Sequence, residues 1–160
     1  MLIPLRNYSN YSICESNIKI KDLVNFAEKE NLPAMALTDY KLLSGALEFS
    51  TKCKNKGIQP IIGLDVDFIS KLKHKSRLTF ICKNNIGFKN LNILSTKINT
   101  ENEFHLSLDN INNFSEGNIL ILGGLFSYFQ DLNINTNNLK VILNEINALK
   151  NFFKNDVFFE

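Results

Sequence analysis

Two aspartates stand where a parallel α/β fold places its reactive groups. Asp39 follows the apolar run Ala34–Leu37 after one residue, Thr38, and Asp65 lies towards the end of the apolar run Pro60–Phe68. Reactive groups in parallel α/β sheets gather at the carboxyl ends of the strands, so any chemistry of this chain is expected at these two carboxylates. Two structural explanations stay equally open. Asp39 is also a good cap for the helix that follows, and a solvated strand end accounts for Asp65.

A metal centre built on these carboxylates needs nitrogen ligands that the histidines do not supply. His74 and His105 are the two histidines, and neither stands in an HxH, HExxH or HxxxH spacing. Both are therefore predicted to be surface residues. The pair Gly123–Gly124 predicts a turn and not a nucleotide-binding loop. The motifs thus exclude a histidine-rich metal centre and a glycine-rich phosphate loop.

Composition indicates one soluble domain. The chain has 160 residues, of which 44% are hydrophobic and 21% charged, and a net charge of +2 is too small for a nucleic-acid-binding domain. Three cysteines without a CxxC spacing favour neither a disulfide framework nor a zinc ribbon, and Cys82 is expected to be a small core residue. With no apolar run long enough for a membrane span and no signal peptide, a cytoplasmic location without a membrane partner is expected.

Hydrophobic periodicity predicts helices alternating with strands. The expected strands are Leu2–Arg6, Ala34–Leu37, Pro60–Phe68, Leu78–Cys82, Ile119–Leu122 and Val157–Glu160. The expected helices cover 20–27, 43–53, 85–98 and Leu139–Phe153. Ser16 or Asn17 is expected to cap the first helix, Thr38 or Asp39 to cap the second, and Gly57 to end the second. The run Thr100–Asn113 is weakly patterned, and a long Asn-rich loop precedes the last helix. Because the final strand stops short, we expect a fragment of a much longer polypeptide.

The basic run Lys71–Arg77, with the sequence KLKHKSR, interrupts this pattern between two strands. A charge run of this kind is typical of a solvated loop, which is the favoured interpretation, and a phosphate contact is the less favoured one.

Several collinear blocks carry a family resemblance that covers most of the chain. They are LRNYSNYS (Leu5–Ser12), IKIKDLV (Ile18–Val24), LPAMALTDY (Leu32–Tyr40), SGALEF (Ser44–Phe49), GIQPIIGLDV (Gly57–Val66), LTFICKNNIGFKNL (Leu78–Leu91) and ILILGG (Ile119–Gly124). In this order and spacing they resemble the N-terminal PHP (polymerase and histidinol phosphatase) domain of bacterial DNA polymerase III alpha subunits. The resemblance implies an α/β fold, namely a partial PHP-type distorted β/α barrel with a mainly parallel sheet, over a single domain from 1 to 160.

Active PHP domains hold metal ions with histidines and carboxylates at the strand exits, and this chain departs from that pattern. The positions concerned are Arg6, Tyr8, Glu15, Asp39, Tyr40, Asp65 and Arg77. By resemblance, Tyr8, Tyr40 and Arg77 stand at histidine positions, a further histidine position falls near Arg6, and Asp65 replaces a glutamate. Glu15 keeps an acidic position.

The replacing residue types decide what such a site can bind. Tyrosine, with a pKa of about 10, is mostly protonated at neutral pH and ligates poorly, and arginine cannot ligate at all. We therefore expect no metal ligand and no catalytic residue in this chain. Arg77 is expected to take over part of the metal's electrostatic role by neutralising Asp65 or Asp39.

The resemblance implies a parent protein that synthesises DNA with magnesium held in polymerase segments outside this chain, whereas this part carries no cofactor. It also implies the rest of the alpha subunit and a proofreading exonuclease subunit as partners, with DNA bound through other domains. The alternatives are a metal-dependent phosphoesterase or proofreading nuclease of the PHP family and, less favoured, a free-standing regulatory protein that binds a phosphorylated metabolite.

Overall fold

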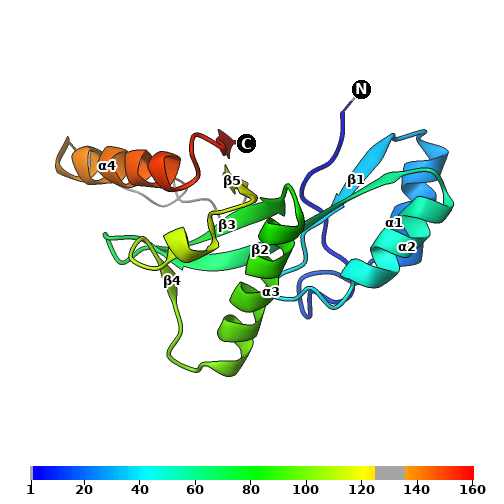
Figure 1. Cartoon of the computed structure of the whole chain (residues 1–160), viewed down its shortest axis with the longest axis horizontal. Helices are drawn as coiled ribbons and strands as arrows, with labels where there is room; N and C mark the ends of the chain where they lie inside the picture. Colours follow the sequence, from blue (N-terminus) through cyan, green and yellow to red (C-terminus); the bar gives the residue numbers. More distant parts are fainter. Residues whose placement is uncertain (1, 125–135) are drawn as a thin grey trace. The chain divides into compact units, whose positions relative to one another are not determined.

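The structure is a computed structural model that describes residues 2–124 and 136–160 (Figure 1). The chain divides into two compact units, one up to Asp65 and the other from Val66 onward. The first unit holds α1 (Ile20–Lys29), β1 (Ala34–Leu37), α2 (Ala46–Asn55) and the first part of β2 (Gln59–Ile69). The second holds the rest of β2, β3 (Lys75–Cys82), α3 (Asn85–Thr100), β4 (Leu106–Ser107), the 3-10 helix η1 (Ile111–Phe114), β5 (Asn118–Leu122), α4 (Thr136–Phe152) and β6 (Val157–Phe159).

A βαβ arrangement forms the centre of the first unit. All four residues of β1 are buried, and β1 pairs in parallel with β2 from Ala34 opposite Gln59 to Leu37 opposite Ile62. Helices α1 and α2 cover this pair with one hydrophobic cluster. Its buried members are Ile20, Leu23, Val24, Ala27, Met35, Leu37, Phe49, Cys53 and Ile58. The continuous apolar run predicted this doubly covered strand with its observed bounds.

The predicted first strand, Leu2–Arg6, is wrong. The segment belongs to no strand, although the N–H groups of Ala36 and Thr38 donate to the carbonyl oxygens of Pro4 (3.3 Å) and Asn7 (2.9 Å). Proline has no N–H to donate, so Pro4 cannot contribute its share of a strand ladder. The segment nevertheless runs beside β1 and positions the polar residues that follow it.

The predicted helix caps in the first unit are also wrong. Lys19 precedes α1 and Gly45 precedes α2, and neither helix has a side-chain cap. Leu47 is 81% exposed because the buried face of α2 runs through Ala46, Phe49 and Cys53. The predicted stop is confirmed, since Gly57 has a φ of +71°.

The second unit is built on a mixed sheet. The strands β2, β3, β5 and β6 are neighbours in that order, and β4 pairs in parallel with the end of β2. Pairing is antiparallel between β3 and β5 and parallel between β5 and β6. The expectation of a mainly parallel sheet is therefore slightly off, because the antiparallel pair lies in the middle of this unit.

Helix α3 lies very close to the start of β5. The side chain of Asn84 caps α3 by accepting from the N–H groups of Ile86 (3.0 Å) and Gly87 (3.1 Å). A Cβ at Gly87 would lie 2.0 Å from the carbonyl oxygen of Gly117. Glycine at position 87 is thus required by the close approach of two backbones.

Other boundaries differ from the predictions in the second unit. Strand β3 begins at Lys75, inside the run predicted as a basic turn, and the weakly patterned Thr100–Asn113 contains both β4 and η1. The predicted last helix and strand are confirmed as α4 and β6, and two leucines of α4, Leu139 and Leu143, are 42% and 50% exposed. The predicted Asn-rich loop lies mainly outside the described residues.

Candidate functional site

The side chain of Asp39 is the centre of a buried hydrogen-bond network at the end of β1. Asp39 is 2% exposed, and its Oδ1 accepts from the N–H of Ser9 and the hydroxyl of Ser12, each at 2.6 Å. Its Oδ2 accepts from the hydroxyl of Ser9 at 2.7 Å. A buried carboxylate is stable only when hydrogen bonds replace its hydration, and these three donors do so. Asp39 is therefore no helix cap.

Asp65 lies beside Asp39 in the neighbouring strand. Its N–H donates to the carbonyl oxygen of Asp39 at 3.1 Å, and Asp65 forms a parallel β-bridge with Tyr40. The Asp65 side chain is 1% exposed, and its Oδ2 accepts from the hydroxyl of Tyr8 at 2.5 Å. The structure thus brings both aspartates together just beyond the paired part of β1 and β2, as the sequence predicted, and buries both, but Asp65 lies inside β2 and not at its end.

The segment 7–16 supplies the donors because it passes the end of β1 and reaches Asp65 within β2. Asn7 fixes its start, since its N–H donates to the Thr38 hydroxyl at 3.0 Å and its side-chain amide donates to the Ala36 carbonyl at 2.9 Å. The Ser16 hydroxyl holds its far end by donating to the carbonyl of Tyr8 at 2.9 Å. Ser12 also accepts from the N–H of Tyr40 at 2.9 Å. The polar loop is therefore held in a defined conformation by hydrogen bonds and forms part of the site.

Ser9 and Ser12 are functional positions that the sequence reasoning did not single out. Both are completely buried, with 0% exposure. The sequence feature that could have pointed to them is the run of short polar residues after Arg6. This run predicts a loop, but it does not show which hydroxyls reach a carboxylate.

The remaining predicted positions of the first unit lie around this network. Lys41 places its Nζ 4.6 Å from the centre of the Tyr40 ring, a cation–π contact. Arg6 is half-buried in the extended N-terminal segment, and Glu15 is exposed in a turn closed by its own N–H, which donates to Ser12 O at 3.0 Å. The contacts described above join Tyr8, Asp39, Tyr40 and Asp65.

Arg77 belongs to the second unit and lies in β3. Its Nε is 3.8 Å from Oδ1 of Asp67, whose other oxygen is 3.2 Å from Nζ of Lys75. Arg77 thus has a carboxylate partner two residues beyond the expected Asp65. Pairing of Arg77 with Asp39 or Asp65 would join the two units and stays a prediction.

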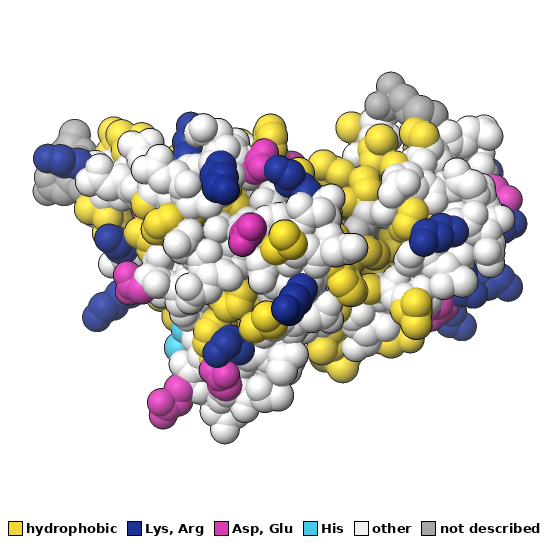
Figure 2. Space-filling view, viewed as in Figure 1, with side chains coloured by type: hydrophobic (Ala, Val, Ile, Leu, Met, Phe, Trp, Pro, Cys, Tyr) yellow, Lys and Arg dark blue, Asp and Glu magenta, His cyan; other side chains and the backbone are white. Residues whose placement is uncertain are grey.

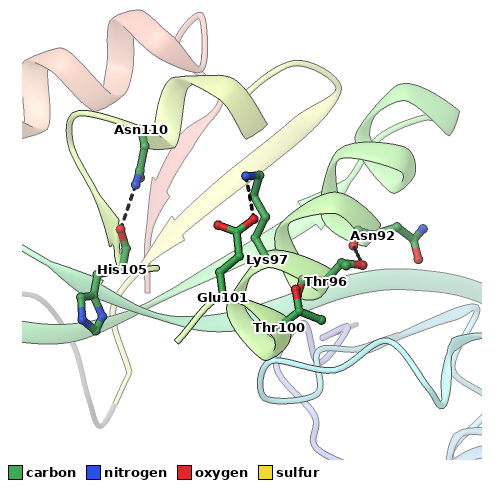
Figure 3. Close-up of polar contacts among 7 residues, drawn as sticks. All are labelled: Asn92, Thr96, Lys97, Thr100, Glu101, His105 and Asn110. Atoms are coloured by element: carbon green, nitrogen blue, oxygen red, sulfur yellow. Dashed lines mark hydrogen bonds and ion pairs between the residues drawn. The ribbon is translucent and has the colours of Figure 1, made fainter. Parts of the chain in front are cut away.

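The two histidines stand apart from the aspartates along the chain. His105 is exposed, and Figure 3 shows its ring pointing away from the neighbouring polar residues, while its carbonyl accepts from the side-chain amide of Asn110 at 2.8 Å. Figure 3 also shows the ion pair of Lys97 with Glu101 (3.1 Å) at the end of α3. His74 is half-buried in the turn before β3. The surface prediction therefore holds fully for His105 and only in part for His74.

The residues around the two aspartates do not fit a metal ion. In the described ranges, no three His, Cys, Asp or Glu side chains are grouped so that they could hold one. The groups aimed at the carboxylates are hydrogen-bond donors, namely the hydroxyls of Tyr8, Ser9 and Ser12. Space is also tight, since a Cβ at Gly45 would lie 3.3 Å from Oδ2 of Asp39. A cation here would have to displace donors that already stabilise the charge.

Comparison with known proteins identifies the class. A family model of the PHP domain matches residues 4–160, and the chain belongs to this family. The resemblance seen in the sequence blocks is thereby confirmed.

The similar curated proteins are DNA polymerase III alpha subunits. The chain is 35% identical to that of Chlamydia pneumoniae and 31% identical to that of Borreliella burgdorferi, over 99% of its own length in each case. It spans only 14% and 15% of the length of these relatives. The chain therefore corresponds to a small part of much longer polypeptides.

A solved structure supports the fold. An amidohydrolase from Chromobacterium violaceum matches with a TM-score of 0.61 and 12% identity, covering 91% of this chain and 74% of the other. At this identity the likeness shows the α/β PHP-type fold alone. Within the part of the chain that the structure describes, no helix is both long and apolar enough to cross a membrane.

Proposed function

We propose that this chain is the PHP-domain part of a DNA polymerase III alpha subunit, a protein that synthesises DNA in chromosome replication. The proposal is supported by the family match over residues 4–160 and by two alpha subunits that share 31% and 35% identity over 99% of the chain. The polymerase chemistry, with its magnesium ions, would belong to segments outside these 160 residues. The rest of that polypeptide is then the first partner of this domain.

We further propose that this part is catalytically silent. The observation that carries this proposal is the hydrogen bond from the Tyr8 hydroxyl to Asp65, at a position where the family pattern has a histidine. A neutral phenol stabilises the buried carboxylate as a donor, whereas a metal ion would need a ligand with a free lone pair. Asp39 is likewise stabilised by serine hydroxyls. The former metal site would thus serve as a structural junction between the loop 7–16 and the strand ends.

The silent domain would support the polymerase core and provide a docking surface for a separate proofreading exonuclease subunit. This role follows from the resemblance to family members with degenerate sites, and an intact fold without its own chemistry is consistent with it. The complete alpha subunit that contains this chain should bind its cognate exonuclease subunit. Absence of binding at tens of micromolar would count against docking.

Metal content tests the silent-site proposal directly. The purified chain is incubated with manganese and zinc, excess ion is removed, and bound metal is measured by mass spectrometry. We expect much less than one ion per chain. A stoichiometric ion in the wild type that is lost in Asp39→Ala would overturn the proposal and would favour a metal-dependent phosphoesterase or nuclease.

A further inference from the structure

The turn between β2 and β3, Ser70–His74, presents uncompensated positive charge. Lys71 and Lys73 are exposed on this turn, and the run from 71 to 77 has four basic residues and no acidic one. Lys75 and Arg77, just beyond the turn, face Asp67 at 3.2 and 3.8 Å. Within the described ranges, no ion pair engages the ammonium groups of Lys71 or Lys73. The charge at the tip of this hairpin is therefore available to a ligand.

The backbone of this turn is ordered by its own hydrogen bonds. Ser70 N–H donates to the carbonyl of His74 at 3.0 Å, and the N–H of Lys73 donates back to Ser70 O at 2.9 Å. The hydroxyl of Ser70, a residue that is 4% exposed, accepts from the N–H of His74 at 3.1 Å. In Figure 1 the turn forms the outer end of the β2–β3 hairpin. The two lysines thus belong to a turn that is closed by backbone hydrogen bonds, and not to an irregular loop.

A buried carboxylate anchors the turn to α4. Glu145 is 1% exposed, and its Oε1 accepts from the backbone N–H of Lys71 at 3.0 Å. Burying a carboxylate is costly unless it is well hydrogen-bonded, so an acidic residue here fixes the turn at a definite place on α4. Glu145 engages the backbone N–H of Lys71, and Lys71 is an exposed residue.

We propose that this basic turn, Ser70–His74, binds the phosphodiester backbone of DNA through Lys71 and Lys73, with Glu145 as the residue that positions it. Ammonium groups are point-charge partners of phosphate, and phosphate contacts carry no base preference. The turn has no Phe, Tyr or Trp ring, and the imidazole of its one histidine, His74, is half-buried, which favours backbone contact over base stacking. The choice of DNA rests on the function proposed above. Figure 2 shows Lys and Arg side chains (dark blue), with some acidic ones (magenta) among them, on the left part of the view, where the second unit lies.

Fluorescence anisotropy with labelled single-stranded and duplex oligonucleotides tests the proposal. The full chain is compared with Lys71→Ala/Lys73→Ala and with the matched pair Lys21→Ala/Lys54→Ala, which removes the same charge from exposed positions on α1 and α2. We expect roughly three- to tenfold weaker binding for the turn variant at 50 mM salt. Its salt slope should be smaller by about 1.4 on single strands, and the matched pair should change affinity by less than about twofold.

Two substitutions of Glu145 separate positioning from net charge. Both Glu145→Ala and Glu145→Gln make the chain more positive by one charge, so general attraction to DNA predicts equal or tighter binding. The proposal predicts weaker binding for Glu145→Ala, and partial rescue in Glu145→Gln because an amide oxygen still accepts from the N–H of Lys71. Circular dichroism checks that both variants stay folded.

Defined outcomes would overturn the inference. They are no binding to either DNA form at 100 µM chain in about 50 mM salt, an equal loss in both lysine pairs, or undiminished binding in folded Glu145→Ala. If duplex and single strand both bind, their relative affinity shows which form the turn prefers, and loss in the turn variant supports the proposal in either case. Metal uptake and exonuclease docking are separate readouts, so failure here leaves the function proposed above to its own tests.

Discussion

The hydroxyl of Tyr8 and the carboxylate of Asp65 form a hydrogen bond of 2.5 Å between residues 57 positions apart in the chain. Next to it, Asp39 accepts from Ser9 and Ser12. Both carboxylates are almost completely buried. Hydroxyl donors of one loop thus stabilise both carboxylates, in the place of a metal ion. The network should therefore contribute to the folding stability of the chain, and substitutions of the donors can measure this contribution.

Removing the phenol hydroxyl should cost stability. In Tyr8→Phe the Oδ2 of Asp65 loses this donor while the ring stays in place, so we expect the free energy of unfolding to fall by about 1.5–3 kcal/mol, the usual range for hydrogen bonds to charged groups. Urea denaturation followed by circular dichroism measures it. Tyr11→Phe is the matched control, because Tyr11 packs against the core through its ring, and it should change the free energy by less than about 0.5 kcal/mol. Equal losses in both variants would contradict the role of the Tyr8–Asp65 bond.

Two serines of the same loop should differ in their contribution to stability. Ser12 is completely buried, donates to Asp39 and accepts from the N–H of Tyr40, so Ser12→Ala leaves two polar groups without that partner. We expect a loss of about 2–4 kcal/mol in the free energy of unfolding. Ser16 is only half-buried and bonds backbone groups at the end of the loop, so Ser16→Ala should cost about 1 kcal/mol or less. Thermal and urea denaturation of the two variants side by side would reveal a reversed order, which would contradict the Asp39 network.

The close approach of α3 to β5 makes a second pair of substitutions informative. A methyl group at position 87 would meet the backbone of Gly117 at 2.0 Å, so Gly87→Ala should lower the free energy of unfolding by about 3 kcal/mol or more. Gly57 has a φ of +71° but open space around it, so Gly57→Ala should cost only about 1–2 kcal/mol from the left-handed backbone. Chemical denaturation distinguishes the two. A similar cost at both positions would mean that the α3–β5 contact relaxes easily.

Local sequence patterns determined most of the elements of this fold. Ala34–Leu37 is apolar without alternation and became a buried parallel strand, and the helix expected over 85–98 is α3. Predictions failed where pairing partners decide the outcome. The segment Leu2–Arg6 is apolar enough for a strand but contains Pro4, and β4 is a strand of two residues that exists only through its pairing with β2.

The site was predictable in its carboxylates and not in its donors. The proximity of Asp39 and Asp65 was predicted because each lies near the carboxyl end of an apolar run that was expected to pair in parallel with the other, which follows from topology alone. Ser9 and Ser12 could not be found this way, since the path of a loop fixes which hydroxyl reaches a buried oxygen. Tyr8 was found only through a family pattern, and its hydrogen bond to Asp65 was not predicted.

The buried thiol of Cys53 should give the stability of the chain a specific pH dependence. Burial of Cys53, which is 0% exposed, raises the pKa of its thiol to about 11. In the unfolded chain the thiol loses its proton near pH 9, the ordinary value, while the folded chain still holds it. The unfolded state then binds fewer protons, so the free energy of unfolding falls as the pH rises from about 9 to about 11. Below pH 9 this contribution is complete.

Urea denaturation at pH 8, 9.5 and 10.5, on wild type and Cys53→Ala, isolates this effect from the titration of lysines, which both chains share. We expect Cys53→Ala to be less stable at pH 8, because it leaves a cavity, and the gap to wild type to narrow by about 1–2 kcal/mol at pH 10.5. Alkylation at pH 8 provides an independent readout, since Cys14 is exposed and should react at once, whereas Cys53 should react only on unfolding. A constant gap across the pH range, or rapid alkylation of Cys53 in the folded chain, would show that the thiol is not held in the apolar contact between α1, α2 and β1 that the fold assigns to it.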